Sequence, residues 1–189
     1  TEAALLAFNA NPPRYIEGMK YSATADRENP DLQFHLARCY FHGYGGVAVH
    51  KPAAARWYLK SANQGCAEAL VPIGLMYEKG DGVALNYAEA VKWYRKAAEK
   101  GDCSGENYLG EMYETGDGVA KDIAEAVKWY RKSAEKGFAR GQLNLARMYA
   151  QGTGVEENQL EAVSWFRKAA EQGEAKAQYL LGLMYAEGN

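Results

Sequence analysis

Two histidines in one predicted helix are the residues best suited to binding a metal. His35 and His42 are seven residues apart, a spacing that places both side chains on one helix face. A zinc site needs three or four ligands, and no third ligand lies at a matching spacing in the sequence. We therefore predict no metal and no cofactor, and we expect His50 to be exposed at the start of a helix.

Closely spaced glycines recur three times and look like loops that bind phosphate. The Gly-x-Gly pairs begin at Gly80, Gly116 and Gly152. A phosphate-binding loop follows a β-strand and, in the nucleotide-binding type, is followed by Lys-Ser or Lys-Thr. Neither feature is present, so the pattern predicts turns.

The cysteines and hydroxyl residues do not form a pattern typical of catalysis. Cys39, Cys66 and Cys103 are odd in number, so any disulfide scheme leaves one thiol over. We expect Cys39 to be a small core residue, and we assign no role to the other two. No grouping of Ser, His and Asp stands out, so we predict that the chain is not an enzyme. Catalytic residues far apart in the sequence remain an open alternative.

The charge balance gives no reason to expect nucleic acid as a partner. The 22 Lys and Arg residues nearly cancel the 24 Asp and Glu residues, which leaves a net charge of −2. No run of about 18 apolar residues is present, and the first residues do not resemble a signal peptide. We predict a soluble chain without direct membrane insertion. Because the chain begins with Thr1 rather than Met, the cytoplasm and a periplasmic or secreted location after removal of a signal both stay open.

An internal repeat defines the elements that position these residues. A Trp, a Gly and a Tyr each recur every 36 residues. The three series are Trp57, Trp93, Trp129 and Trp165; Gly65, Gly101, Gly137 and Gly173; and Tyr77, Tyr113, Tyr149 and Tyr185. Tyr40 precedes Tyr77 by 37 residues, because the loop at residues 43–47 is one residue longer than the loop at residues 80–83.

One repeat, residues 66–101, begins with a predicted helix that we name the A helix. Its apolar residues recur at helical spacing over residues 69–77. Gly80 and Gly82 then supply the backbone freedom that ends the helix. The repeat Tyr therefore lies near the end of each A helix.

The second predicted helix of the repeat, the B helix, has clear start and stop signals. It begins at Asn86 with Glu89 three residues on, a capping-box pattern that two later repeats share. Gly101 fits the left-handed conformation that follows a helix. In the first full repeat His50 and Pro52 replace the usual cap and its follower, so we expect that B helix to begin differently.

Small and aromatic residues at fixed positions predict how the helices stack. A small residue stands three before each repeat Tyr, where it lets the neighbouring helix approach: Ala37, Gly74, Gly110, Ala146 and Gly182. We expect the repeated Trp and Tyr side chains to form the core. The pattern predicts an all-α protein, an α/α superhelical solenoid of helix-turn-helix repeats of about 36 residues. The expected divisions are a degenerate N-terminal cap or partial repeat at residues 1–30, repeat 1 at 31–65, repeat 2 at 66–101, repeat 3 at 102–137, repeat 4 at 138–173, and the first helix of a truncated repeat 5 at 174–189.

These motifs resemble those of Sel1-like repeats, which are relatives of the tetratricopeptide repeat. The A-helix motifs read IGLMYEKGDGV, LGEMYETGDGV and LARMYAQGTGV, and the B-helix motifs read AVKWYRKAAEKG, AVKWYRKSAEKG and AVSWFRKAAEQG. The resemblance covers residues 31–189. It implies an α/α superhelix of bacterial type that acts as an adaptor or scaffold in signalling, in membrane-associated quality control or in contacts with host cells.

The resemblance also implies that the A helices line a concave surface where a protein or peptide binds. On these helices the positions two and six before the repeat Tyr vary in chemistry and share one face. The predicted partner-binding residues are Phe34, Arg38, Val71, Leu75, Asn107, Glu111, Leu143, Arg147, Tyr179 and Leu183. We expect aromatic and Arg side chains to act as anchors. Replacing Arg38 and Arg147 by Glu should then abolish binding without unfolding the protein.

Two other interpretations remain open. The variation is also what drift on a solvated face would produce. The chain is alternatively a self-association or spacer module of a larger protein, with the truncated last A helix as the contact between copies.

Overall fold

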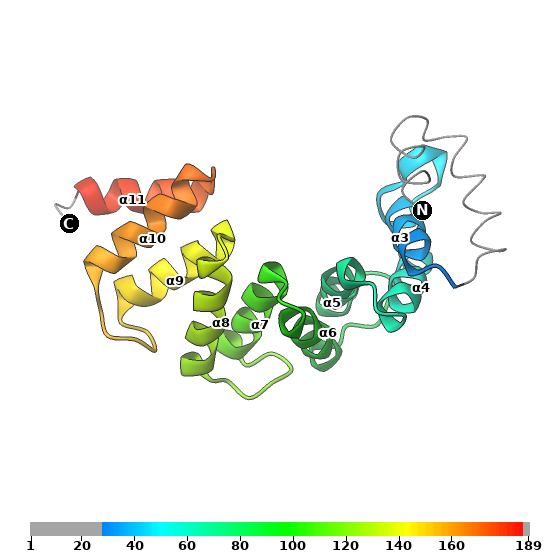
Figure 1. Ribbon diagram of the computed structural model, residues 1–189, viewed down its shortest axis with the longest axis horizontal. Coiled ribbons are helices and arrows are strands. Elements are labelled where there is room, and N and C mark those ends of the chain that lie inside the picture. The colour runs from blue at the N-terminus through cyan, green and yellow to red at the C-terminus, as the bar shows by residue number, and fades with distance from the viewer. Residues whose placement is uncertain (1–27, 187–189) are drawn as a thin grey trace. The chain divides into compact units, whose positions relative to one another are not determined.

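The computed structural model describes residues 28–186, and the regular elements in this range are all helices (Figure 1). The α-helices are α3 (Pro30–His42), α4 (Lys51–Asn63), α5 (Leu70–Lys79), α6 (Tyr87–Glu99), α7 (Cys103–Thr115), α8 (Ile123–Glu135), α9 (Ala139–Gln151), α10 (Gln159–Glu171) and α11 (Ala175–Ala186). Two short 3₁₀ helices, η1 (Tyr44–Gly46) and η2 (Ala67–Ala69), precede α4 and α5. The predicted all-α solenoid is confirmed. The expected N-terminal cap lies outside the described residues, apart from its last three.

A helices (α3, α5, α7, α9 and α11) alternate along the chain with B helices (α4, α6, α8 and α10) in two compact units. The boundary falls inside α6, between Trp93 and Tyr94. In the first unit α4 packs against both α3 and α5. In the second unit each helix from α7 to α11 packs against the next, and α7 also contacts α9 (Figure 1).

The predicted caps begin the B helices. The backbone N–H groups of Glu89, Glu125 and Glu161 donate to the side-chain oxygens of Asn86, Asp122 and Asn158 at 3.1, 3.0 and 3.1 Å. The first B helix begins in the same way, because Nδ1 of His50 accepts the N–H of Ala53 at 3.1 Å. The expected difference is confirmed in the acceptor, because an imidazole nitrogen replaces the usual side-chain oxygen, while the cap lies at the equivalent repeat position. His50 is exposed, as predicted.

The backbone N–H of each cap residue ties the B helix to the preceding A helix. These groups donate to the carbonyl oxygen of the repeat Tyr in the pairs His50–Tyr40, Asn86–Tyr77, Asp122–Tyr113 and Asn158–Tyr149, at 2.8 to 3.0 Å. The capping box is therefore only half formed, because the cap N–H has a backbone partner already. The carboxylates of Glu89 and Glu125 instead pair with Lys92 and Lys128.

The Gly-x-Gly segments form the predicted turns. Gly80 follows α5 with a φ of 69°, and Gly82 has a φ of 77°. A Cβ atom at Gly82 would overlap the backbone carbonyl of Lys51, at the start of the preceding B helix. Glycine is required there for close packing as well as for its backbone conformation.

The small residue before the repeat Tyr also has a packing role. Ala37 and Ala146 are fully buried. A Cβ atom at Gly110 would lie 2.7 Å from Cε1 of Tyr130, whereas a Cβ atom at Gly182 would meet nothing within 4 Å. The predicted close approach is confirmed in α7.

The expectation that every repeated Trp and Tyr lies in the core is wrong in detail. Of the Trp series only Trp93 is buried, and Tyr185 at the end of the Tyr series is 52% exposed. The fully buried aromatic residue is the one that follows each Trp: Tyr58, Tyr94, Tyr130 and Phe166. The repeat Tyr stays near the surface because its hydroxyl accepts a hydrogen bond from the Arg of the preceding B helix, in the pairs Arg95–Tyr113, Arg131–Tyr149 and Arg167–Tyr185, at 3.0, 2.8 and 2.7 Å.

Candidate functional site

The variable surface of the molecule is found at the junctions between repeats. We use "junction" for the place where the A and B helices of one repeat meet the A helix of the next repeat. Three junctions lie within one unit each: repeats 1 and 2 in the first unit, and repeats 3 and 4 and repeats 4 and 5 in the second. The same repeat positions form all three, so their side chains can be compared directly.

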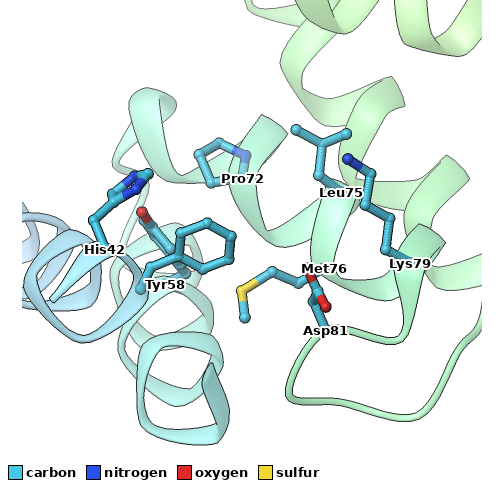
Figure 2. A pocket seen from close by; sticks show the side chains of 8 residues that line it. His42, Tyr58, Pro72, Leu75, Met76, Lys79 and Asp81 are labelled. Carbon is cyan, nitrogen blue, oxygen red and sulfur yellow. The ribbon is translucent and has the colours of Figure 1, made fainter. Parts of the chain in front are cut away.

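The junction of repeats 1 and 2 holds a pocket of about 290 Å³. Its walls are Phe41, His42, Tyr58, Pro72, Leu75, Met76, Lys79 and Asp81. In the view of Figure 2, His42 and Leu75 lie on opposite sides, with Tyr58 and Met76 between them. At the rim, Nζ of Lys51 pairs with Oδ1 of Asp81 at 2.7 Å. We name this site pocket 1–2.

Aromatic rings surround the floor of pocket 1–2. The ring centroid of Tyr58 lies 5.8 Å from that of Phe34 and 6.5 Å from that of Phe41. His42 stacks on Tyr44 with centroids 4.9 Å apart. Burial raises the pKa of the Tyr58 hydroxyl to about 12. The pocket is therefore predominantly apolar, with polar groups at its edge.

A second pocket, of about 410 Å³, lies at the junction of repeats 4 and 5. It is lined by Arg147, Ala150, Gln151, Gln159, Phe166, Lys176, Leu180, Leu183 and Met184. We name it pocket 4–5. Six of these residues occupy the repeat positions that line pocket 1–2: Ala150 for Phe41, Gln151 for His42, Phe166 for Tyr58, Leu180 for Pro72, Leu183 for Leu75 and Met184 for Met76.

The junction of repeats 3 and 4 is closed by polar side chains at the same positions. Glu114 stands where pocket 1–2 has Phe41, and Arg147 stands where it has Leu75. The Tyr130 hydroxyl donates to Oε2 of Glu114 at 2.6 Å, and the Arg147 guanidinium donates to Oε1 at 3.1 Å. Burial and the Glu114 carboxylate together raise the pKa of Tyr130 far above its ordinary value.

Further hydrogen bonds link α7 to α9 beside this closed junction. Asn144 donates to Oδ1 of Asn107 at 2.9 Å and to Oε1 of Glu111 at 3.2 Å. Oδ1 of Asn144 in turn accepts from Arg147 at 3.2 Å, and Glu111 pairs with Arg140 at 3.1 Å. A buried network with its members satisfied rigidifies the helices it joins.

The structure separates the predicted partner-binding residues by position. Among the residues two before the Tyr, Leu75 and Leu183 line pockets, Arg147 borders one pocket and closes another junction, Glu111 pairs with Arg140, and Arg38 lies over the Phe34 ring at 5.8 Å. Among those six before, Asn107 and Leu143 are buried, Phe34 and Val71 are half-buried, and Tyr179 is 65% exposed.

The sequence prediction missed most of each pocket wall, because it named only Leu75 in pocket 1–2 and only Arg147 and Leu183 in pocket 4–5. The missed residues include the two that follow the repeat Tyr and the aromatic residue that follows the Trp. A signal was available, because the position after the Tyr holds Phe41, Glu78, Glu114 and Ala150 and varies as much as the predicted positions. The aromatic residue that follows the Trp gives no such signal, because it is a repeated core residue that also lines the pocket.

The expectation that Arg147→Glu leaves the fold intact needs correction. Arg147 is only 29% exposed and pairs with Glu114. A Glu at position 147 would place a carboxylate beside this Glu, a repulsion that costs stability. Binding tests therefore need variants of the pocket walls.

Cys39 and Cys66 have the properties of core residues, and Cys103 is half-buried. Cys39 is fully buried, as predicted, and Cys66 is 6% exposed. Burial raises the pKa of both thiols, which lowers the fraction of reactive thiolate. Over residues 28–186 no three metal-ligating side chains come together, and no helix there has the length and apolar character to cross a membrane.

A family model and several solved structures match this chain along its repeats. A family model described as the Sel1 repeat matches residues 30–66, 67–102, 104–138, 139–174 and 175–189. Of the solved structures, the protective antigen c5321 from uropathogenic Escherichia coli, described as having an SLR fold, is 39% identical over 91% of this chain, with a TM-score of 0.83. A Sel1 repeat protein from Oxalobacter formigenes is 34% identical over all of it, with a TM-score of 0.87. Cysteine-rich protein B from Helicobacter pylori is 25% identical over 70% of it, with a TM-score of 0.59 and 98% of that chain covered.

The chain spans 36% of the length of the Escherichia coli protein and 76% of the Oxalobacter formigenes protein. A search of curated proteins found no match. The three similar structures are bacterial.

Proposed function

Because the chain belongs to the Sel1 repeat family, we propose that it is a non-catalytic scaffold that binds a protein or peptide partner on its A-helix surface. Sel1 repeats mediate protein–protein interactions, and proteins built from them are generally interaction scaffolds. The proposed contact sites on this chain are the junction pockets, where one wall comes from each of two successive A helices.

One observation supports this proposal above the others. Pockets 1–2 and 4–5 lie in different units and are formed by the same repeat positions, yet their side chains differ. A conserved framework with variable pockets is the arrangement by which repeat proteins select partners, because framework residues maintain the helix stack while pocket residues choose the ligand. A repeated pocket also allows one extended partner to gain affinity from several weak contacts.

Site-specific photo-crosslinking in extracts of the source cells tests the proposal. A photoreactive amino acid replaces Leu75 in pocket 1–2 or Leu183 in pocket 4–5. Leu160 on a B helix is 85% exposed and provides a matched control position outside both pockets. We expect one partner to crosslink at the pocket positions and not at Leu160. Crosslinks at Leu160 alone, or equal crosslinking at all three positions, would contradict the proposal.

A second candidate function is self-association through α11. This helix exposes Tyr179, Leu183 and Tyr185 at 65, 41 and 52%. A second copy of the chain would cover these apolar side chains. Sedimentation velocity at increasing protein concentration is the test. A dimer that Leu183→Glu dissociates supports this candidate, and a monomer at every concentration argues against it.

A further inference from the structure

The two pockets differ in the charge of their polar groups. Pocket 4–5 is bordered by Arg147 and Lys176, with Gln151 and Gln159 beside them, and its lining among the described residues includes no carboxylate. Pocket 1–2 is bordered by one lysine, Lys79, and by Asp81, whose carboxylate pairs with Lys51. The lining of pocket 4–5 thus has two cations, of which Arg147 pairs with Glu114 and Lys176 forms no ion pair within residues 28–186.

Arg147 is held in position from the side of α7 and α8. One of its terminal nitrogens donates to Asn144 at 3.2 Å, and the other donates to Glu114 at 3.1 Å. A guanidinium has five N–H donors in a fixed plane, so three remain for a ligand. Because the side chain is already oriented, a bound anion costs less conformational entropy than it would with a free arginine.

Lys176 supplies the second positive charge from the first turn of α11. It is exposed, and it forms no ion pair within residues 28–186. By contrast, Asp81 at the rim of pocket 1–2 already has a lysine partner at 2.7 Å. Pocket 1–2 also has an exposed lysine, Lys79, without an ion pair among the described residues, but its lining includes the Asp81 carboxylate, whereas the lining of pocket 4–5 has Lys176 and Arg147 and no carboxylate.

Between the cations and the floor, the surface of pocket 4–5 is apolar. Phe166 forms the floor position, and Leu180, Leu183 and Met184 form the α11 wall. The volume of about 410 Å³ lies within the range of ligand-binding clefts, about 300 to 1,000 Å³. An apolar side chain that enters it removes apolar surface on both partners from water.

We infer that pocket 4–5 binds an acidic-apolar segment of a partner protein, in which one apolar side chain enters the pocket and a neighbouring Asp or Glu carboxylate pairs with Arg147 and Lys176. This inference rests on the proposed scaffold function and adds the chemistry of the partner. Charge complementarity selects the carboxylate, and the apolar walls supply most of the affinity.

An array of short Gly/Ser peptides tests the inference. Each peptide carries one apolar residue (Leu, Phe, Met or Ala) and one neighbouring residue (Asp, Glu, Asn, Gln or Lys). The full chain is the labelled probe, and hits are measured again in solution by fluorescence anisotropy. We expect Asp and Glu peptides with Leu, Phe or Met to bind about five- to tenfold more tightly than their Asn, Gln and Lys counterparts.

Three variants locate the effect. Lys176→Gln, an exposed change with no ion pair to lose, should remove most of the preference for Asp and Glu while folding is unchanged. Leu183→Ser should weaken binding of every apolar peptide. Leu75→Ser, the equivalent change in pocket 1–2, should leave the acidic preference as it is.

The possible failures differ for the inference and for the scaffold function. Equal binding of acidic and amide peptides, an acidic preference that survives Lys176→Gln, or no peptide binding up to about 1 mM overturns the inference. The scaffold proposal stands in each of these cases if a partner still crosslinks at Leu75 or Leu183. Both fall if no peptide binds and no partner crosslinks.

Discussion

Two neighbouring junctions of the second unit share one helix framework but differ in the side chains that line them. Between repeats 3 and 4, Tyr130 and Arg147 both donate to the Glu114 carboxylate, and the three side chains close the junction. Between repeats 4 and 5, Ala150, Phe166 and Leu183 occupy these three positions and leave a pocket of about 410 Å³. The backbone caps and turns are the same in both. The difference shows that a few side chains beside the framework aromatic residue decide whether a junction is a polar contact or an apolar pocket.

Repeat 3 also differs from repeats 1 and 4 in the pair of side chains that joins its A helix to its B helix. In repeats 1 and 4 a neutral pair joins the two helices, Gln64 to Gln33 at 2.9 Å and Gln172 to Gln142 at 2.8 Å. In repeat 3 the same two positions hold Lys136 and Glu106, which pair at 2.6 Å. The Glu106 side chain is 3% exposed, and its Oε2 atom has no hydrogen-bond partner within the described residues.

Lys136→Met should have the largest effect on stability, because it leaves the buried Glu106 carboxylate without a cation. We expect a loss of about 2 to 3 kcal/mol in the free energy of unfolding, below the range for fully buried pairs because Lys136 is 42% exposed. Urea denaturation followed by circular dichroism measures it. The double variant Glu106→Gln, Lys136→Gln restores the neutral pair of repeats 1 and 4 and should lie within about 1 kcal/mol of the parent. A double variant as unstable as Lys136→Met would show that the charge pair is not the cause.

Gly110→Ala should be the next most damaging change, because the new Cβ atom would lie 2.7 Å from the ring of Tyr130. Tyr130 is fully buried and bonded to Glu114, so the ring cannot move away. We expect a loss of about 2 kcal/mol by thermal or urea denaturation. Gly182→Ala in α11, where a Cβ atom meets nothing within 4 Å among the described residues, is the control and should stabilise this helix by about 0.5 to 1 kcal/mol. Equal effects at both sites would mean that the close approach does not matter.

Arg147→Leu gives the closed junction the residue that the open pockets have. Glu114 keeps its bond to Tyr130 and loses its cation, and both side chains of the lost pair are only 23 to 29% exposed. We expect a loss of about 1 to 2 kcal/mol. The triple variant Arg147→Leu, Glu114→Ala, Tyr130→Phe carries the side chains of repeats 4 and 5 and should open a new apolar pocket. Increased binding of a solvatochromic apolar dye measures that opening, and unchanged dye binding would show that more than these three residues keeps the junction closed.

Local signals in the sequence explain why the helices and caps were predictable and the junctions were not. Asn86, Asp122 and Asn158 are recognised from residues three positions away, and Gly80 from its own turn. The burial of Asn107 depends on Asn144, 37 residues further on, and the partner of Arg147 is 33 residues away. The variation between repeats showed that the positions of Asn107 and Arg147 differ in chemistry from repeat to repeat. It does not show whether a variable polar residue contacts a partner or a neighbouring helix.

The buried hydroxyl of Tyr58 in pocket 1–2 should make the stability of the protein decline in alkaline solution. Burial raises the pKa of Tyr58 from 10.0 to about 12, so the folded protein holds this proton more tightly than the unfolded chain. Stability from this group is complete below about pH 10 and declines as the pH rises toward 12. Compared with the parent, Tyr58→Phe should lose about 1 kcal/mol less between about pH 8 and about pH 11, measured by urea denaturation. Tyr179→Phe, which removes a hydroxyl at a 65% exposed position, is the control variant. If Tyr58→Phe declines as steeply as the parent, the hydroxyl at the pocket floor is not buried in solution, and pocket 1–2 is wetter than its apolar walls indicate.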